Sequence, residues 1–276
     1  MEARDPLRFS PLTYIKTAKP PFNLIPQSPP HVFQPVTMSV SYSISQVFLA
    51  IAIVLSAAGT WAGITPPNPL PDKIPASGDT IRHFIVAQHK YGHLLFLPFG
   101  LAALYHAALV LTYPDIPESL LLYGAENGLN MRYVTWSKAT TVSLALILCI
   151  GMPLRLLSYA GLGKNFTFAL SEPDRLNTRG LYRYIQHPSY TGVIALVAGA
   201  NGLWGRLDGV ASCILHPWLF SKLRAIEPAM TSLALAVFLF GFWRRVREEE
   251  LMLRTKFGSE WEAWHSRTAR FIPWVF

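Results

Sequence analysis

Charged residues are scarce in this chain of 276 residues: Asp, Glu, Lys and Arg make up 14%, whereas apolar residues make up 51%. Soluble domains usually hold about 25% charged residues. The deficit predicts that much of the protein surface faces lipid rather than water. The net charge of +8 then favours anionic membrane lipid, rather than nucleic acid, as the partner of the basic surface.

Cysteine is also scarce, and no metal-binding pattern accompanies it. Cys149 and Cys213 lie in apolar stretches without a CxxC motif or a Cys/His ligand spacing, which argues against a disulfide scaffold and a zinc site. Several histidines lack an acidic group at ligand spacing, and we interpret them as core or interface residues: His83, His89, His93 and His106. We therefore predict no metal.

The N-terminal 40 residues are rich in proline and lack the compact apolar region and cleavage site of a signal peptide. We predict that residues 1–40 form a flexible tail or an arm on the membrane surface. The chain closes on Pro-Trp-Val-Phe. That ending has no cysteine box, so we do not expect the protein to be prenylated itself.

Long apolar runs dominate the rest of the sequence. Ile44–Ile64, Tyr91–Tyr113 and Ala139–Ala160 are each long enough to cross roughly 30 Å of hydrocarbon at about 1.5 Å per residue. Tyr190–Trp204 and Ala229–Trp243 are shorter and reach only about 22 Å by the same rise. The alternative, helices buried in a large soluble core, fits poorly with three such runs and so little charge.

These runs predict an all-α fold: a polytopic membrane bundle of about five transmembrane helices with a cytosolic loop and a C-terminal helix. Residues 41–160 would hold the first three helices, and residues 161–276 the other two with the polar segments. Between the last two runs, Gly205–Pro228 suits an interfacial helix or a re-entrant turn. We found no internal repeat.

Lys and Arg are more numerous in the connections 65–90 and 161–189 and in the C-terminal segment than in the connections 114–138 and 205–228. Positive charge near membrane helices marks the cytosolic side. The connections 65–90 and 161–189 and the C-terminal segment are therefore predicted to lie in the cytosol.

The first polar constellation is Gln186-His187-Pro188-Ser189-Tyr190. Pro188 suits the first turn of a helix, so the preceding residues would lie where free N–H groups favour an anion. Tyr182, Tyr184 and Tyr190 surround this position. Such a site could hold a zwitterion with an additional cationic centre, its carboxylate on the N–H groups and its cation on the aromatic faces. An interfacial aromatic belt with a capping histidine is the alternative.

The second constellation is Arg244 to Glu250, which leaves an apolar helix on the same predicted side. Arg244 and Glu248 share a helix face, as do Arg245 and Glu249. A solvated helix held by such pairs is the ordinary interpretation. Its position favours a polar cavity instead, because charge at membrane depth is costly unless it lines one.

Together these segments resemble the isoprenylcysteine carboxyl methyltransferase family and the related membrane phospholipid methyltransferases. The first motif comprises Gly180, Tyr182, His187, Pro188, Tyr190 and Gly192. The second comprises Arg245, Glu249, Glu250, Leu253, Phe257, Gly258, Trp261 and Trp264. The closing residues 270–273 look like the family's terminal aromatic-Pro segment. The resemblance covers about residues 160–276, and residues 1–160 match only as membrane spans.

The resemblance implies an S-adenosylmethionine-dependent membrane methyltransferase, here of the endoplasmic reticulum with its site facing the cytosol. The implied cofactor-binding residues are Asp174, Arg175, Leu176, Asn177, Tyr182, His187, Pro188, Ser189, Tyr190 and Glu249. Arg245 would face the carboxylate of a prenylated protein C-terminus or a prenylcysteine-like lipid, and His187 is the second expected catalytic residue. The family's prenyl-protein members often carry a Gln early in the cofactor loop, and residues 166–171 have none.

Two other functions stay open at this point. In a phospholipid or small-lipid N-methyltransferase, the amine would need a base, with Glu250 or His187 as the candidates. The other alternative is a non-catalytic membrane protein that binds lipid.

Overall fold

The computed structural model describes residues 43–72, 74–75 and 78–273, all within the unit Val40–Phe276. The predicted N-terminal tail, residues 1–40, lies outside the described residues. Within the described part the chain is helical and has no strand, although one isolated parallel bridge joins Ile185 and Ala269. The all-α prediction is confirmed.

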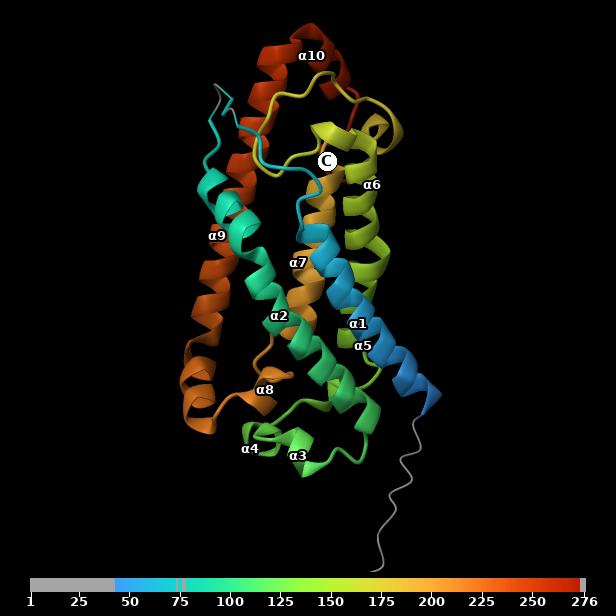
Figure 1. Ribbon diagram of the computed structural model, residues 1–276, viewed down its shortest axis with the longest axis vertical. Coiled ribbons are helices and arrows are strands. Elements are labelled where there is room, and N and C mark those ends of the chain that lie inside the picture. The colour runs from blue at the N-terminus through green and yellow to red at the C-terminus, as the bar shows by residue number, and fades with distance from the viewer. Residues whose placement is uncertain (1–42, 73, 76–77, 274–276) are drawn as a thin grey trace, which may run out of the picture. The chain divides into compact units, whose positions relative to one another are not determined.

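Five long helical segments organise this unit (Figure 1). They are α1 (Ile44–Ile64), α2 (Arg82–Thr112), the continuous α5 (Lys138–Ala145), η2 (Leu146–Gly151) and α6 (Met152–Leu162), then α7 (Pro188–Trp204) and α9 (Pro217–Phe257). Shorter pieces connect them: α3 (Glu118–Leu121), α4 (Gly124–Asn127), η1 (Met131–Tyr133), η3 (Gly163–Asn165), η4 (Gly180–Arg183), α8 (Ala211–Ile214) and α10 (Ser259–His265).

The apolar runs predicted as spans are helical. Ile44–Ile64, Met131–Asn165 and Pro217–Phe257 are long and apolar enough to cross a membrane. The bent α2, with a change of direction of 65° between Arg82–Gly92 and Phe96–Thr112, is a fourth candidate. The predicted number of about five transmembrane helices also included α7. Its 17 residues reach only about 25 Å at 1.5 Å per residue, which is short of the hydrocarbon thickness. The fold is that of a polytopic membrane protein.

The short apolar run Ala229–Trp243 extends into both flanks. Helix α9 begins at Pro217, inside the segment for which we expected an interfacial helix or a re-entrant turn, and runs for 41 residues. Pro217 occupies the first helical turn, where the missing N–H is harmless, and the His216 ring accepts a hydrogen bond from the Trp218 amide. Pro228 lies inside the helix, so this proline does not mark its start.

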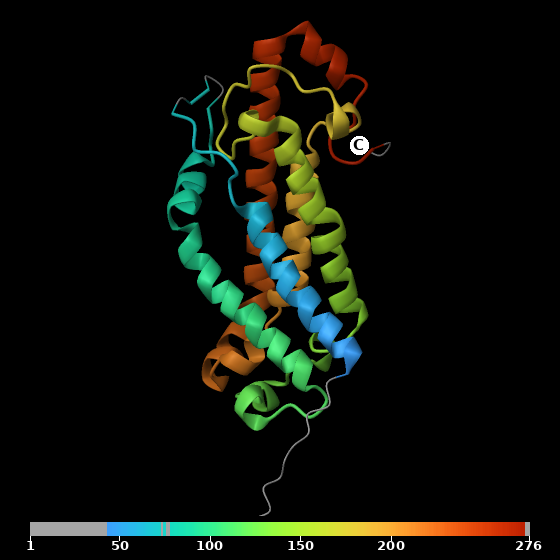
Figure 2. The same cartoon turned by 45° about the vertical axis from the view of Figure 1, so that its right-hand side comes forward.

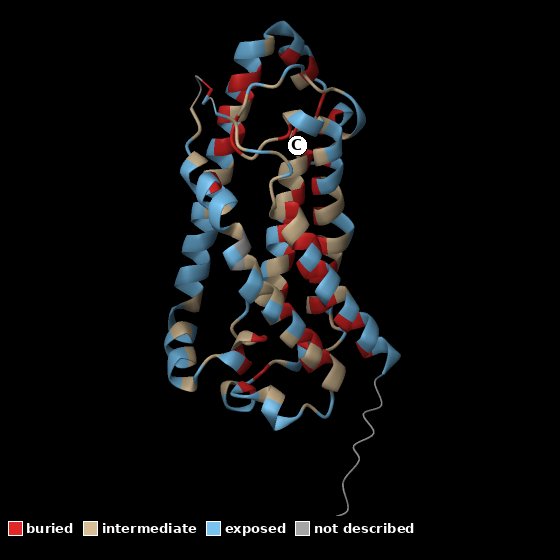
Figure 3. Cartoon of the chain, in the orientation of Figure 1, coloured by how far each residue is buried: buried red, intermediate tan, exposed pale blue. Residues whose placement is uncertain are grey.

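Helix α7 packs closely against α5 and η2 because glycines face the contact. A Cβ atom on Gly199 would lie 2.7 Å from the Ser143 carbonyl oxygen, and one on Gly192 would lie 3.1 Å from the Gly151 carbonyl oxygen. Small residues let helix backbones approach in a membrane, where van der Waals packing replaces the hydrophobic effect. The buried residues therefore gather on α1, the α5–α6 segment and α7 (Figure 3).

The apolar half of α9 has a different environment. None of its apolar window is buried, and its buried residues all lie between Arg245 and Leu253. The connection before α2, the loop after α6 and the second half of α9 meet at one end of the unit, together with α10 (Figures 1 and 2). This is the grouping that the distribution of basic residues predicted. Its cytosolic orientation stays a prediction.

The glycine contact gives a test of the fold. Gly199→Ala places a methyl group against backbone that cannot move away, and we expect it to lower the free energy of unfolding by about 1–3 kcal/mol. Gly241→Ala is the matched control, because no atom lies within 4 Å of the added Cβ on that exposed part of α9. Thermal unfolding in detergent would measure both, and equal melting temperatures would contradict the packing described.

Candidate active site

A buried guanidinium holds three segments of the chain together. Arg245 is 4% exposed. Its Nη1 donates to Asp79 Oδ1 at 2.7 Å, its Nη2 donates to the Phe168 carbonyl, and its Nε donates to the Tyr190 hydroxyl at 3.2 Å. The Leu170 amide donates to Asp79 Oδ2 at 2.8 Å, so the carboxylate is fixed from both sides.

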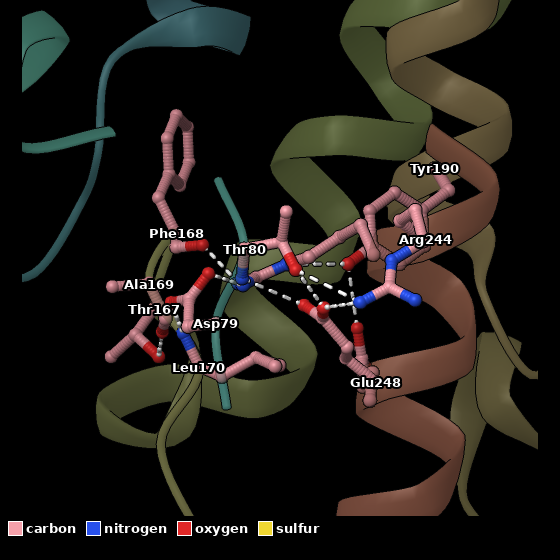
Figure 4. Close-up of polar contacts among 11 residues, drawn as sticks. Asp79, Thr80, Thr167, Phe168, Ala169, Leu170, Tyr190, Arg244 and Glu248 are labelled. Atoms are coloured by element: carbon pink, nitrogen blue, oxygen red, sulfur yellow. Dashed lines mark hydrogen bonds and ion pairs between the residues drawn. The ribbon is translucent and has the colours of Figure 1, made fainter. Parts of the chain in front are cut away.

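Figure 4 shows how these groups are arranged: Asp79, Phe168 and Leu170 lie on the loop side, whereas Tyr190 comes from a helix. The three bonds of Arg245 use three of the five N–H donors of a guanidinium. No hydrogen bond between described residues accounts for the other two donors.

A second contact joins α9 to the connection before α2, which carries Asp79. Glu248 is 7% exposed, and it accepts hydrogen bonds from the amide of Thr80 at 3.0 Å and from the Thr80 hydroxyl. Arg244 donates to Glu248 at 3.2 Å. Arg244 and Glu248 therefore do form the predicted helix-face pair, and Glu248 also fixes the segment that carries the buried acid.

The beginning of α7 meets the carboxylates of α9, as the sequence predicted. His187 Nε2 lies 3.5 Å from Glu250 Oε1, and His187 Nδ1 lies 3.9 Å from Glu249 Oε1. Arg270 Nε lies 3.0 Å from the same Glu250 oxygen. The Tyr190 hydroxyl donates to Glu249 Oε2 at 2.7 Å. The Glu249 side chain is 28% exposed, against 8% for Glu250, so Glu249 is the carboxylate that a small molecule can reach.

The C-terminal segment holds the turn before α7 in place. Gln186 is 4% exposed and donates to the Thr268 carbonyl at 2.5 Å, while its Oε1 lies 2.8 Å from His265 Nδ1. The amides of Gln186 and His187 donate to the carbonyls of Ala269 and Arg270. Burial lowers the pKa of His265. These contacts fix the backbone from which His187 projects.

The predicted cofactor loop lies in another environment. Asp174 forms an exposed ion pair with Lys164 at 2.7 Å, and this cation lowers the pKa of the carboxyl. Asn177 donates to the Gly161 carbonyl at 3.0 Å. Asp174 and Arg175 line an open hollow of about 380 Å³ at the end of α6.

Other expected cofactor-binding residues are more buried than Asp174 and Arg175. Leu176 packs on the apolar cluster that contains Tyr182, Trp261 and Trp264, and burial raises the pKa of the Tyr182 hydroxyl. Pro188 is fully buried at the start of α7. The structure thus brings His187, Tyr190, Arg245 and Glu249 into one cluster and leaves Asp174 and Asn177 at a surface.

Several residues of the site escaped sequence analysis. Asp79 and Thr80 lie in a polar connection with no local signal. Arg155 did have a sequence signal, since it is the only charged residue in an apolar run. Its side chain donates to the Gly63 carbonyl at 2.6 Å and to the Ser189 hydroxyl. The residue is 6% exposed, and its guanidinium lies 4.8 Å from the centre of the Phe168 ring. A buried charge in a span marks a functional region.

The residues present fit a sulfonium zwitterion. His187 Nε2 is buried and forms no hydrogen bond with a described residue, although Glu250 Oε1 lies 3.5 Å from it, and the dipole of α7 beside it favours an anionic group. Glu249 offers a reachable carboxylate for an ammonium. No group of three or more His, Cys, Asp or Glu residues that could hold a metal occurs among the residues described. His106 is buried with Nε2 2.6 Å from the Tyr133 carbonyl.

Residues 143–230 match the family described as "Isoprenylcysteine carboxyl methyltransferase (ICMT) family". That stretch is therefore similar to this family. The match includes His187 and Tyr190 but ends before Arg245 and the glutamates.

Two kinds of relative match the chain, which spans about half to three fifths of their length. A "Probable protein-S-isoprenylcysteine O-methyltransferase" of Oryza sativa, found in both the indica and japonica subspecies, is 24% identical over 138 residues. These are 49% of this chain and 61% of the rice protein. The "Protein-S-isoprenylcysteine O-methyltransferase" of Schizosaccharomyces pombe is 26% identical over 132 residues, 46% of this chain and 47% of the relative. No solved structure matches the chain.

The buried ion pair gives a test of the site's architecture. Asp79→Ala leaves the Arg245 guanidinium without its carboxylate, and breaking a buried pair by removing one partner lowers stability by about 3–5 kcal/mol. Glu262→Ala is the matched control: its pair with Arg254 is exposed, with side chains 55% and 63% accessible, and such pairs contribute about 0–1 kcal/mol. Thermal unfolding of both variants in detergent would compare them. Similar losses would show that the Asp79 contact is dispensable.

Proposed function

We propose that the protein transfers a methyl group from S-adenosylmethionine to the C-terminal carboxylate of a prenylated cysteine. The names of the rice and fission yeast relatives support this activity over the matched stretch. The proposed location is the endoplasmic reticulum membrane, with the site facing the cytosol.

The observation that carries the proposal is the position of Arg245 at the junction of an aromatic row and a polar cluster. The Tyr190 ring lies 5.4 Å from the Phe242 ring, which lies 6.2 Å from Phe238 on the apolar half of α9. Phe271 continues the row, 5.5 Å from Phe242 and 5.8 Å from His187. A molecule with a hydrocarbon tail and a carboxylate would find apolar rings and a guanidinium in that order.

In this proposal Arg245 binds the acceptor carboxylate through its two remaining N–H donors, by charge-assisted hydrogen bonds. No general base is needed, because an α-carboxyl with a pKa of about 3.5 is ionised at neutral pH. The residues around it orient the carboxylate and exclude water, which is how positioning accelerates a two-reactant step. The hydrogen bonds that Arg245 donates to Asp79, Phe168 and Tyr190 keep the guanidinium rigid for that purpose.

His187 and Glu249 hold the donor in this proposal. Glu249, together with the Tyr190 hydroxyl bound to it, meets the ammonium. The α7 N-terminus with His187 meets the carboxylate. When bound, S-adenosylmethionine supplies an electrophilic methyl group, and in this proposal the Tyr190 ring stabilises its positive sulfur. The exposed 174–177 loop would cover the donor from the outside.

The acceptor is identified by a turnover assay. Purified protein in detergent would receive labelled S-adenosylmethionine and either a farnesylcysteine analogue or an ethanolamine phospholipid. We expect label in a base-labile ester of the farnesylcysteine only. Label on the phospholipid amine would establish an N-methyltransferase, and failure to bind the donor at all would establish a non-catalytic lipid-binding protein.

Two substitutions separate donor from acceptor. Loss of a charge-assisted hydrogen bond weakens binding by about 1.5–3 kcal/mol, so Glu249→Ala should raise the Kd for S-adenosylmethionine by roughly 10- to 100-fold. Arg245→Lys should mainly raise KM for the acceptor, because a lysine keeps the charge and loses the fork. Glu260→Ala, an exposed acid on α10, is the control. Equal losses of both affinities in both variants would contradict the division of roles.

A third substitution tests the turn before α7. His187→Ala should abolish methyl transfer while the protein stays in the membrane fraction, since the ring faces both glutamates and α7 keeps its packing glycines. Normal turnover in the purified variant would return this histidine to a capping role.

A further inference from the structure

A second hollow, of about 480 Å³, lies outside the buried cluster, where the last turns of α6 meet η4. Its lining is mostly apolar and aromatic, with one cation: Leu157, Gly161, Leu181, Tyr182, Tyr184 and Arg179. None of these lining residues is acidic. The hollow therefore suits an apolar group beside an anion, and it lacks the carboxylate that an ammonium or sulfonium would need.

Two arginines stand at its rim. Arg179 lines the hollow, and the Arg183 guanidinium lies 5.7 Å from the centre of the Tyr184 ring, which also lines it. Both arginines are exposed. The ion pairs formed by described residues involve neither of them, in contrast to Lys164 and Arg254, which each pair with an acid. The basic charge at the rim is thus available to an external anion.

The hollow also lies at the end of a candidate membrane span. α6 belongs to the apolar segment Met131–Asn165. Its residues Leu156 and Leu157 are 40% and 55% exposed, and Tyr184 across the hollow is 54% exposed. Exposed leucines next to exposed tyrosine and arginine are the arrangement found where hydrocarbon gives way to lipid head groups.

We propose that this hollow binds an anionic glycerophospholipid of the surrounding membrane. Its acyl chains lie on Leu157 and Leu181, and its phosphate lies between the guanidinium groups of Arg179 and Arg183. The ring of Tyr184 supports the glycerol region and orients Arg183. The hollow shares Tyr182 with the expected cofactor-binding residues, but His187, Arg245 and Glu249 do not line it, and the lipid site does not depend on the proposed methyl transfer.

The expected loss of lipid affinity on removing the two arginines is large enough to measure. A basic residue close to an anionic lipid surface strengthens attraction by roughly fivefold, so loss of both arginines should weaken phosphatidylglycerol binding by about 20-fold. Free phosphate has no chain to place on the apolar wall, and phosphatidylcholine has a compensating cation beside its phosphate.

The test uses the full chain purified in detergent and titrated with phosphatidylglycerol, phosphatidylcholine or inorganic phosphate. Bound lipid is read by native mass spectrometry and by the shift in melting temperature. The double variant Arg179→Gln/Arg183→Gln is compared with Lys138→Gln/Lys222→Gln, which removes the same charge from exposed positions in other segments. A phosphatidylglycerol with a photoreactive acyl chain maps the site on the wild-type protein.

We expect phosphatidylglycerol to bind at least tenfold more tightly than phosphatidylcholine, the arginine variant to lose about 20-fold, and the lysine variant to match wild type. Cross-links should fall on peptides containing Leu157 or Leu181. Equal binding of the two lipids, equal losses in both variants, or equal stabilisation by inorganic phosphate would overturn the proposal. So would displacement of the lipid by S-adenosylmethionine, which would assign the hollow to the donor.

Discussion

The ion pair between Arg245 and Asp79 is the contact on which the polar end of the molecule depends. Burying two charges is expensive, and their attraction compensates only when the remaining donors and acceptors are also satisfied. Here the Leu170 amide, the Phe168 carbonyl and the Tyr190 hydroxyl complete the network. Because these partners come from three segments, the connection before α2, the loop after α6 and α7 take positions relative to α9 that a single guanidinium defines.

The apolar part of the molecule follows a different principle. Glycines on α7 and η2 let backbones approach until side chains have no room, and a membrane helix gains stability from this van der Waals contact. The polar end needs specific partners for each charge, whereas the spans need small residues at matching positions. Arg155 contacts both parts of the molecule. It is buried in α6, yet it donates a hydrogen bond to Ser189 at the start of α7 and lies over the rings of Tyr159 and Phe168.

Much of this arrangement could be predicted from the sequence, because hydrophobic length and local motifs carry their own information. The run Ile44–Ile64 coincides with α1, and Pro188 begins α7 as its fixed backbone angle requires. The meeting of His187 with Glu249 and Glu250 followed from placing two motifs at the same membrane face. Asp79 could not be found this way, since its partner lies 166 positions away and an acid in a polar connection looks like any other. The start of α9 at Pro217 was not expected, because the segment 205–228 has an apolar centre between basic ends and therefore looks interfacial.

The long helix α9 packs against the rest of the protein mainly near its two ends. Near its start the Tyr123 and His216 rings are in contact, and near its other end its glutamates and Arg245 meet the rest of the chain. The apolar window between them has no buried residue, although Phe242 contacts the Tyr190 and Phe271 rings, so the rest of its surface is open to lipid. A molecule dissolved in the bilayer can then reach the rings of Phe238 and Phe242 by lateral diffusion, without crossing water. The frequency of such encounters would follow the amount of that molecule per unit area of membrane, and its concentration in the aqueous phase would matter little.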